Sequence, residues 1–311
     1  MTYESSQHAL AIITPLKITE DELVTTNVPD SGYPAWVNTK TYSKGDKVYL
    51  LSNNITYESL QDNNTGNNPA EENSTYWLMM RLDNRWAAFD ISTSTMAKNP
   101  GNIHYLLKPG IAITSVAVLN IYDATDVTIT MYDGQKSEGD IVYQKTVAID
   151  DIQQTSGWWE FFYGQKHAPT QVILTDLPSY VNCQIDISIN GGDELAIGGI
   201  VLGRPVSFGM GVKLGARVGI LDYSRKETNQ FGDVTLIQRA FAKRASFDMM
   251  VRKNEVDPLQ QFLAAIRATP VLWIGTTEYE ALTLIGYYKT FEILISYPEY
   301  SLVEFQLEGL P

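Results

Sequence analysis

Six short apolar segments recur at regular intervals through the middle of this 311-residue sequence, and they constrain its fold more than any other feature. They are rich in β-branched residues and alternate between apolar and polar positions, as strands with one buried face do. Turns rich in Gly, Asp and Pro separate them, and no apolar pattern of helical spacing intervenes. The segments are 115–121, 127–132, 141–147, 171–175, 183–189 and 195–202. This arrangement predicts an antiparallel β-sandwich or jelly roll.

The chain is longer than one ordinary domain, and its composition changes along its length. An apolar run near the start, with no local partner, predicts an arm that packs on a distant part of the chain or on a neighbour. The next segment is too small for a large core, so a few aromatic side chains must supply one. We therefore predict a mainly β, multi-domain protein. Its units are an N-terminal strand or arm with a linker (1–32), a small aromatic-cored β domain (33–82), a β-sandwich (83–203) and a C-terminal α+β unit (204–311).

The C-terminal unit carries the one well-marked helix of the sequence. Asp257 is a good N-cap residue, and Pro258 suits the first helical turn. Apolar residues with helical spacing then form one stripe, namely Leu259, Phe262, Leu263 and Ile266. We expect a strand pair at 234–251 and further strands at 271–274, 282–288 and 292–307.

Charge is distributed unevenly along the chain. Residues 1–203 contain 11 Lys and Arg against 24 Asp and Glu, whereas 204–311 contain 12 of each, so the net charge of −13 lies in the first two thirds. An acidic surface repels nucleic acid, so we expect no nucleic-acid partner. The neutral last third suits packing against other subunits. Its basic pairs fit either interface salt bridges or solvated strand edges, and the residues concerned are Arg225, Lys226, Lys243, Arg244, Arg252 and Lys253. The first four are the candidate interface residues.

Residue constellations typical of catalysis are missing from the sequence. The histidines, at 8, 104 and 167, lie far apart and have no metal-ligand companions. A Gly-rich segment at 209–215 has the wrong spacing for a dinucleotide turn and is better explained as a flexible or subunit-facing loop. Cys183 lies in a strand-like context and is expected to be a buried, unreactive thiol. We therefore predict no catalytic residues, no metal site, no cofactor and no enzymatic activity.

The aromatic segment carries the most specific motif. Trp36, then 42–48, Tyr57, Asn68-Pro69 and 76–77 together resemble the small chitin-binding modules that are appended to chitinases and cellulases. The resemblance implies a carbohydrate-binding-module-like β domain, with candidate sugar-binding residues Trp36, Tyr42, Tyr57, Tyr76 and Trp77. Sugar-binding members expose adjacent aromatic residues just after the position of Tyr57, but this chain has Glu-Ser-Leu-Gln at 58–61. Either the module binds glycan, or it is a spacer whose aromatic residues only form its core.

Two looser resemblances cover the rest of the chain. Residues 83–203 are similar in strand order to galactose-binding jelly rolls, and we interpret their densest aromatic cluster, at Trp158 and Trp159, as a subunit interface. The C-terminal unit resembles virion proteins of the bacteriophage distal tail or baseplate. The segments that carry this resemblance are 202–204, 222–226, 229–236, 256–257, 270–275 and 307–310.

These resemblances imply a structural virion protein of a phage tail tip or baseplate ring. Its partners would be other copies of itself, other tail proteins and a cell-surface glycan. No continuous apolar run reaches the length of a membrane span, and no signal-like segment opens the sequence. We therefore expect synthesis in the host cytoplasm, no secretion and no membrane insertion. The alternative is a stand-alone or accessory carbohydrate-binding protein of a polysaccharide-processing system.

Overall fold

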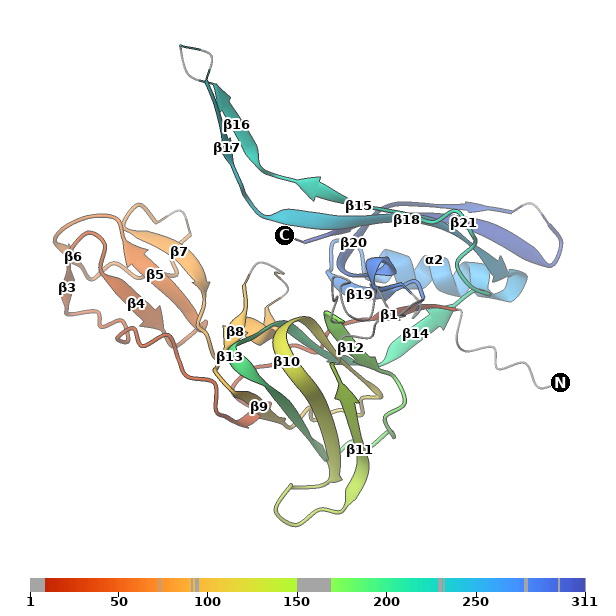
Figure 1. Cartoon of the computed structure of the whole chain (residues 1–311), viewed down its shortest axis with the longest axis horizontal. Coiled ribbons are helices and arrows are strands. Elements are labelled where there is room, and N and C mark those ends of the chain that lie inside the picture. Colours follow the sequence, from red (N-terminus) through yellow and green to blue (C-terminus); the bar gives the residue numbers. More distant parts are fainter. Residues whose placement is uncertain are drawn as a thin grey trace, which may run out of the picture.

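The predicted mainly β, multi-domain class is confirmed by a computed structural model, which is 54% strand and 7% helical (Figure 1). The structure describes residues 9–72, 74–90, 92, 95–149, 169–228, 231, 233–276, 279–295 and 297–310. Within these ranges no helix is long and apolar enough to cross a bilayer. Three β-rich units make up the described chain: a small aromatic module, a sandwich and a C-terminal sheet with the single α-helix.

The sandwich is one seven-stranded antiparallel sheet that curls around a continuous core. The strand order is β11-β10-β13-β9-β2, with β12 also paired to β10 and β8 to β13. The strands are β2 (Leu23–Thr26), β8 (Ala97–Lys98), β9 (Asn102–Leu107), β10 (Ser115–Asp133), β11 (Ile141–Ala148), β12 (Gln171–Leu174) and β13 (Cys183–Gly203). The short 3-10 helix η1 (Ala87–Phe89) closes one side of the core.

Four of the six predicted strands merge into two long bent ones. We expected separate strands at 115–121 and 127–132, but both belong to β10, and 183–189 and 195–202 both belong to β13. The bend in β10 lies at Asn120 and Asp123, which adopt positive φ, and the ladder shifts register there. From the side-chain pattern alone, such a bend is predicted to be the end of a strand, although the backbone pairing continues through it.

The C-terminal sheet also has seven antiparallel strands, in the order β14-β1-β19-β20-β21-β18-β15. Helix α2 (Val256–Ala265) packs on one face, where Leu259 and Leu263 are fully buried against Trp273 and Phe305. The strands are β1 (Leu10–Ile13), β14 (Pro205–Phe208), β15 (Arg217–Asp222), β18 (Phe241–Arg252), β19 (Val271–Ile274), β20 (Thr283–Leu294) and β21 (Tyr300–Gly309). The 3-10 helices η2 (Lys253–Glu255) and η3 (Glu280–Leu282) connect them.

Three details of this unit differ from prediction. Asp257 lies in the first turn of α2 and is not its N-cap, because the chain is already helical through η2. The segment 234–251 is not one strand pair. It forms β17 (Val234–Ile237) and β18, which pair with β16 (Arg225–Thr228) and β15, since no tight turn reverses the chain at 238–240. The residues 292–294 end β20 and do not begin β21.

The aromatic module consists of two small sheets around a compact aromatic core. Its strands are β3 (Thr41–Tyr42), β4 (Lys47–Leu50), β5 (Ile55–Ser59), β6 (Asn64–Thr65) and β7 (Trp77–Leu82). The core contains only five buried apolar residues, Tyr42, Val48, Leu50, Tyr57 and Trp77.

The units are nested within one another along the chain. β1 pairs with β14 so that Ile13 lies opposite Pro205, and the whole sandwich and aromatic module are therefore inserted between two neighbouring strands of the C-terminal sheet. The apolar N-terminal segment thus packs on a distant part of its own chain, which is one of the two outcomes predicted from the sequence. The aromatic module is in turn inserted into the sandwich, because the Ser31 amide donates to Asp83 Oδ1 (2.7 Å) and the Asn84 amide donates to Ser31 Oγ (3.0 Å). We call residues 10–13 and 205–310 the frame.

Sandwich and frame share a packed boundary. Ile13 on β1, Leu272 on β19 and Ile285 on β20 lie on the frame face away from α2, where they pack against Ala117 and Leu119 of β10. Thr170, at the start of the sandwich strand β12, also donates through its hydroxyl to Glu280 of the frame (2.9 Å). The frame therefore carries the sandwich on one face and α2 on the other (Figure 1).

Candidate assembly surface

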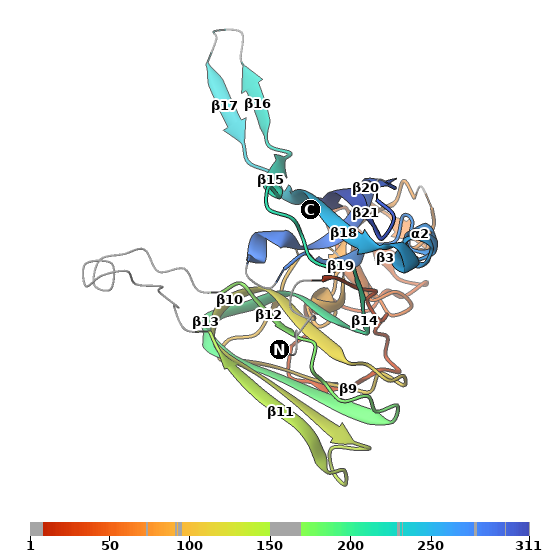
Figure 2. The same ribbon diagram turned by 90° about the vertical axis from the view of Figure 1, so that its right-hand side faces the viewer.

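A two-stranded ribbon leaves the frame and projects away from the body of the molecule in both views (Figures 1 and 2). It continues the β15–β18 hairpin, since the Tyr223 amide donates to the Ala240 carbonyl (3.3 Å) and the Arg239 amide donates to Ser224 Oγ (3.1 Å). β16 and β17 then pair with each other alone. We call these two strands the arm.

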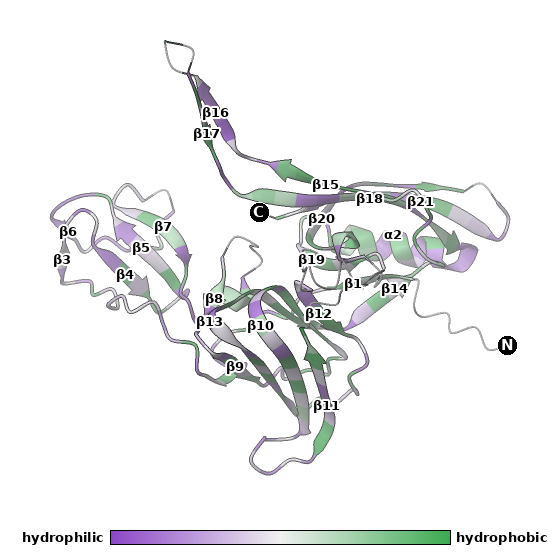
Figure 3. Cartoon of the chain, in the orientation of Figure 1, coloured by the Kyte–Doolittle hydropathy of each residue, from purple (hydrophilic) through white to green (hydrophobic). Residues whose placement is uncertain are grey.

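Every residue of the arm's two strands is exposed. β16 is hydrophilic, whereas β17 is Val-Thr-Leu-Ile (Figure 3). Val234 and Leu236 lie on one face with Lys226 opposite Leu236, and Ile237 lies on the other face opposite Arg225. Leu236 is 76% exposed, and none of the core clusters formed by the described residues includes any part of the arm.

The base of the arm is apolar as well. Val218 and Ile220 on β15, and Phe241 at the start of β18, are each more than half exposed. Val218 lies opposite Ala245, which belongs to the core under α2, so its side chain points to the helix face of the sheet. The helix does not extend to this edge strand, and the apolar face stays uncovered there.

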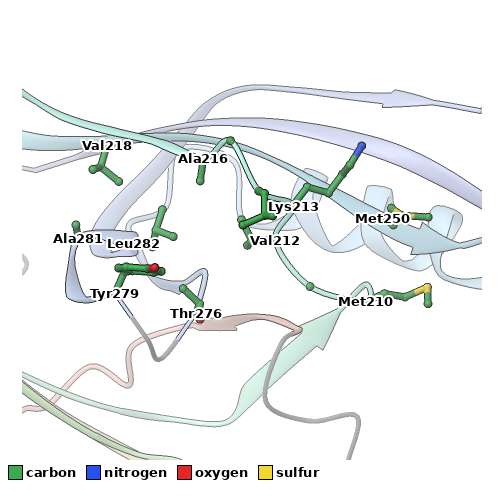
Figure 4. A pocket seen from close by; sticks show the side chains of 13 residues that line it. Met210, Val212, Lys213, Ala216, Val218, Met250, Thr276, Tyr279, Ala281 and Leu282 are labelled. Carbon is green, nitrogen blue, oxygen red and sulfur yellow. The ribbon is translucent and has the colours of Figure 1, made fainter. Parts of the chain in front are cut away.

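An apolar cavity of about 550 Å³ lies beside this base (Figure 4). Its walls come from the loop 210–216, from β15 and from the segment around η3, and among the described residues that line it Lys213 is the only charged one. The loop lies alongside β18, because the Met210 amide donates to the Met250 carbonyl and the Lys213 amide donates to the Asp248 carbonyl, both at 2.8 Å. The residue before this loop is Gly209, where φ is +76° and an added Cβ would lie 2.7 Å from a β18 carbonyl.

Several of the apolar side chains that line the cavity are exposed to solvent. Leu214 is fully exposed, and Met210, Val218 and Tyr279 are each more than half exposed. An exposed apolar patch of this kind marks an interaction surface more often than a random surface does. The Gly-rich segment that the sequence suggested as a flexible or subunit-facing loop forms one wall of this cavity.

The predicted interface residues are divided between the arm and its base. Arg225 and Lys226 are exposed on β16, and Arg225 Nε forms an ion pair with Glu227 Oε1 (3.2 Å). Lys243 and Arg244 follow each other on β18, at the base, with Arg244 exposed and Lys243 half-buried. The other predicted interface residues, Trp158 and Trp159, lie outside the described residues.

The predicted sugar-binding residues gather in the aromatic module, most of them inside it. The rings of Tyr42, Tyr57 and Trp77 are buried, and Trp36 packs against this core while remaining partly accessible. Tyr42 and Trp77 meet edge to face with centroids 5.2 Å apart. Tyr76 is the exposed member of the set. A buried ring has no face to offer a sugar, so glycan binding stays a prediction centred on Tyr76 and Trp36.

The best-defined cluster of titratable groups in the described chain has a structural geometry. Asp186 on β13 lies 2.6 Å from His104 Nε2 and also pairs with the Lys136 ammonium. Burial raises the pKa of Asp186, but the interactions with the His104 imidazole and the Lys136 ammonium outweigh it and hold this pKa below its ordinary value. Cys183 is buried, and burial raises the pKa of its thiol. No group of three or more His, Cys, Asp or Glu in the described ranges is placed to hold a metal ion.

The apolar residues of the arm, above all Val234, Leu236 and Ile237, were not predicted from the sequence to form an exposed surface. The signal was present, because a Val-Thr-Leu-Ile strand puts apolar side chains on both faces. Comparison with protein-family models and with curated proteins finds no match for this chain.

Proposed function

We propose that this chain is a non-enzymatic structural protein of a bacteriophage tail, one subunit of a ring at the tail tip or baseplate. The frame assembles copies of the chain, and the two inserted β modules are displayed for contact with a host-surface glycan. The protein is made in the host cytoplasm and resides in the virion, and its partners are other copies and other tail proteins.

The nested chain path is the observation that supports this proposal most. Because Ile13 and Pro205 are ladder partners, an insertion of any size fits between β1 and β14 without disturbing the frame. The same holds for the aromatic module within the sandwich at the Ser31–Asp83 junction. Such a path separates an assembling unit from replaceable display units.

The charge distribution agrees with this division of labour. The last third of the chain is neutral, whereas the first 203 residues carry the whole net charge of −13. Neutral surfaces pack together at lower electrostatic cost than strongly acidic ones, which favour solvent. Displayed modules that repel each other would splay outward from a ring.

Glycan contact through such modules would be weak for each copy and strong for the assembly. Tyr76 is exposed at the edge of the aromatic module, and Trp36 is partly accessible. One or two partly exposed rings give low affinity, but linked copies on a ring raise the apparent affinity by about 10²–10⁴.

The test is the solution mass of the purified full-length protein by light scattering on a sizing column, with negative-stain images of the peak. We expect a closed oligomer of the 34.8 kDa chain. A monomer that stays on a chitin or peptidoglycan column would contradict the assembly function and favour a stand-alone carbohydrate-binding protein. A monomer that stays on neither column would contradict both.

A further inference from the structure

We propose that the arm of one copy docks in the apolar cavity of a second copy, so that the chain assembles head to tail. This inference rests on the proposed function, because it names the surface through which the frame would self-assemble. The occupant is a second copy of this chain, and the contact joins β17 of one copy to the cavity walls of the next.

The arm needs a partner for physical reasons. A two-stranded ribbon is marginally stable at best in water, because no third layer covers its side chains. Here all eight ladder residues are exposed, and three of them are large and aliphatic. Burial of Val234 and Leu236 against a second surface would supply the missing layer.

The arm cannot reach its own cavity. Its direction is fixed by the six-pair ladder between β15 and β18, which leads it away from the frame in two perpendicular views (Figures 1 and 2). The cavity lies at the base of the arm, with Val218 in its wall (Figure 4). A second copy is needed to bring an arm to it.

The cavity suits aliphatic side chains. Val212, Leu214, Val218 and Leu282 line it, and of its described wall residues only Lys213 carries a charge. A volume of about 550 Å³ is within the range of sites that bury a ligand of several side chains' size. A strongly charged partner would find little to neutralise it there.

The exposed apolar side chains supply most of the apolar area that a small specific contact buries. The arm and its base expose Ile220, Val234, Leu236, Ile237 and Phe241, and the cavity rim exposes four more large apolar side chains. At roughly 100 Å² for a fully exposed side chain, these partly exposed residues supply about 550 Å² in all. The smallest specific interfaces bury ~1,200 Å², of which about 700 Å² is apolar.

The geometry makes the contact heterologous, since the arm and the cavity are different surfaces of the same chain. Each copy then offers one arm and one cavity, and the contact propagates from copy to copy. Such a contact produces a ring when the rotation between copies closes, and a filament when it does not.

Two exposed positions allow a clean test in the full-length protein. Leu236→Asp places a charge on the arm, and Leu214→Asp places one on the cavity rim. Both residues are at least 76% exposed, so neither change removes a side chain from the core of the subunit. The matched control is Thr235→Asp, which puts the same charge on the opposite face of the same strand.

We expect light scattering and sedimentation velocity to show that each leucine variant weakens self-association by ~30-fold or more, as loss of a central interface residue does. The Thr235→Asp protein should associate as the parent does. An equal mixture of Leu236→Asp and Leu214→Asp chains should form a one-to-one dimer, because one intact arm and one intact cavity remain. That dimer is the signature of head-to-tail docking.

The outcomes separate this inference from the proposed function. If the parent protein forms an oligomer that neither leucine change weakens, the docking surface is wrong while self-assembly stands. If only Leu236→Asp weakens the oligomer, the contact is arm to arm; if both changes weaken it but the mixture stays monomeric, an intact arm does not bind an intact cavity. Either result shows that the head-to-tail geometry is wrong. A parent protein that is monomeric at every concentration tested would overturn both proposals.

Discussion

Replacement of Trp77 by alanine should unfold the aromatic module and leave the rest of the chain folded. Trp77 is 4% exposed, contacts Tyr42 edge to face and donates through Nε1 to the Asn67 carbonyl (2.9 Å). A buried Trp→Ala change costs about 3–5 kcal/mol. Because the aromatic pair with Tyr42 is lost as well, we expect a cost near the upper end of that range. A module of ~50 residues is stable by only about 2.5–7.5 kcal/mol. The substitution therefore removes most or all of the module's stability.

Unfolding should stay local because the module is attached at one junction. The chain enters at Ser31 and leaves at Asp83, and the sandwich core lies beyond that point. In scanning calorimetry the module's transition should disappear, while the transitions of sandwich and frame stay within about 2 °C. Limited proteolysis with mass spectrometry should place the new cleavage sites within 33–82.

Tyr76→Ala is the matched control. Tyr76 is the preceding residue and is 39% exposed, so its removal should cost about 0.5 kcal/mol or less. The reasoning would be refuted if Trp77→Ala lowered all transitions together, because the module would then not be an independent unit. It would also be refuted if Trp77→Ala cost no more than Tyr76→Ala.

Three further predictions concern single residues elsewhere. Burial raises the pKa of Asp90 to about 6, so the charge of this carboxylate opposes folding above that pH. Asp90→Asn should therefore stabilise the chain by about 1 kcal/mol at pH 8 but not at pH 4. Urea titrations at both pH values measure this difference. The lowered pKa of Asp186 means that its stabilisation is present at neutral pH and is lost as pH falls through that value. Lys136→Met should therefore cost ~1–3 kcal/mol at pH 7 and less at pH 3 in the same assay, and an equal cost at both would contradict the ion-pair explanation. Gly286→Ala would put a Cβ 2.1 Å from a backbone oxygen of β21 and should cost more than ~2 kcal/mol by thermal melting. Gly199→Ala, whose nearest neighbour is at 4.0 Å, should cost less, and equal costs would show that the close approach is unimportant.

The sequence predicted best those features that depend on local spacing. The stripe of α2 follows from the 3.6-residue period alone, and Leu259 and Leu263 are buried as that period requires. The small size of the aromatic module predicted that a few aromatic side chains build its core, and Tyr42, Tyr57 and Trp77 are buried there. Cys183 was likewise predicted from its strand-like context and is buried.

Features that depend on distant pairing were beyond the sequence. Nothing near residues 10–13 indicates that they pair with 205–208 and 271–274, because the register of a ladder is set by partners far along the chain. The candidate site shows the same limit. The basic pair Arg225-Lys226 was noticed by its charge, but the exposure of Leu236 depends on where the β15–β18 ladder directs the arm.

The position of β1 has a consequence for synthesis of the chain. β1 lies between β14 and β19, so its two ladder partners are translated only after the sandwich and the aromatic module. About 260 residues separate Ile13 from Ile274, and at ~5–20 residues per second a ribosome needs roughly 13 to 50 s to cover them. Sandwich strands form far faster than this, so the inserted units can complete their cores while the apolar Leu-Ala-Ile-Ile segment still waits for partners. The frame is thus the first unit begun and the last finished, and a nascent chain stalled before residue 271 would present an open strand to any chaperone or neighbouring chain nearby.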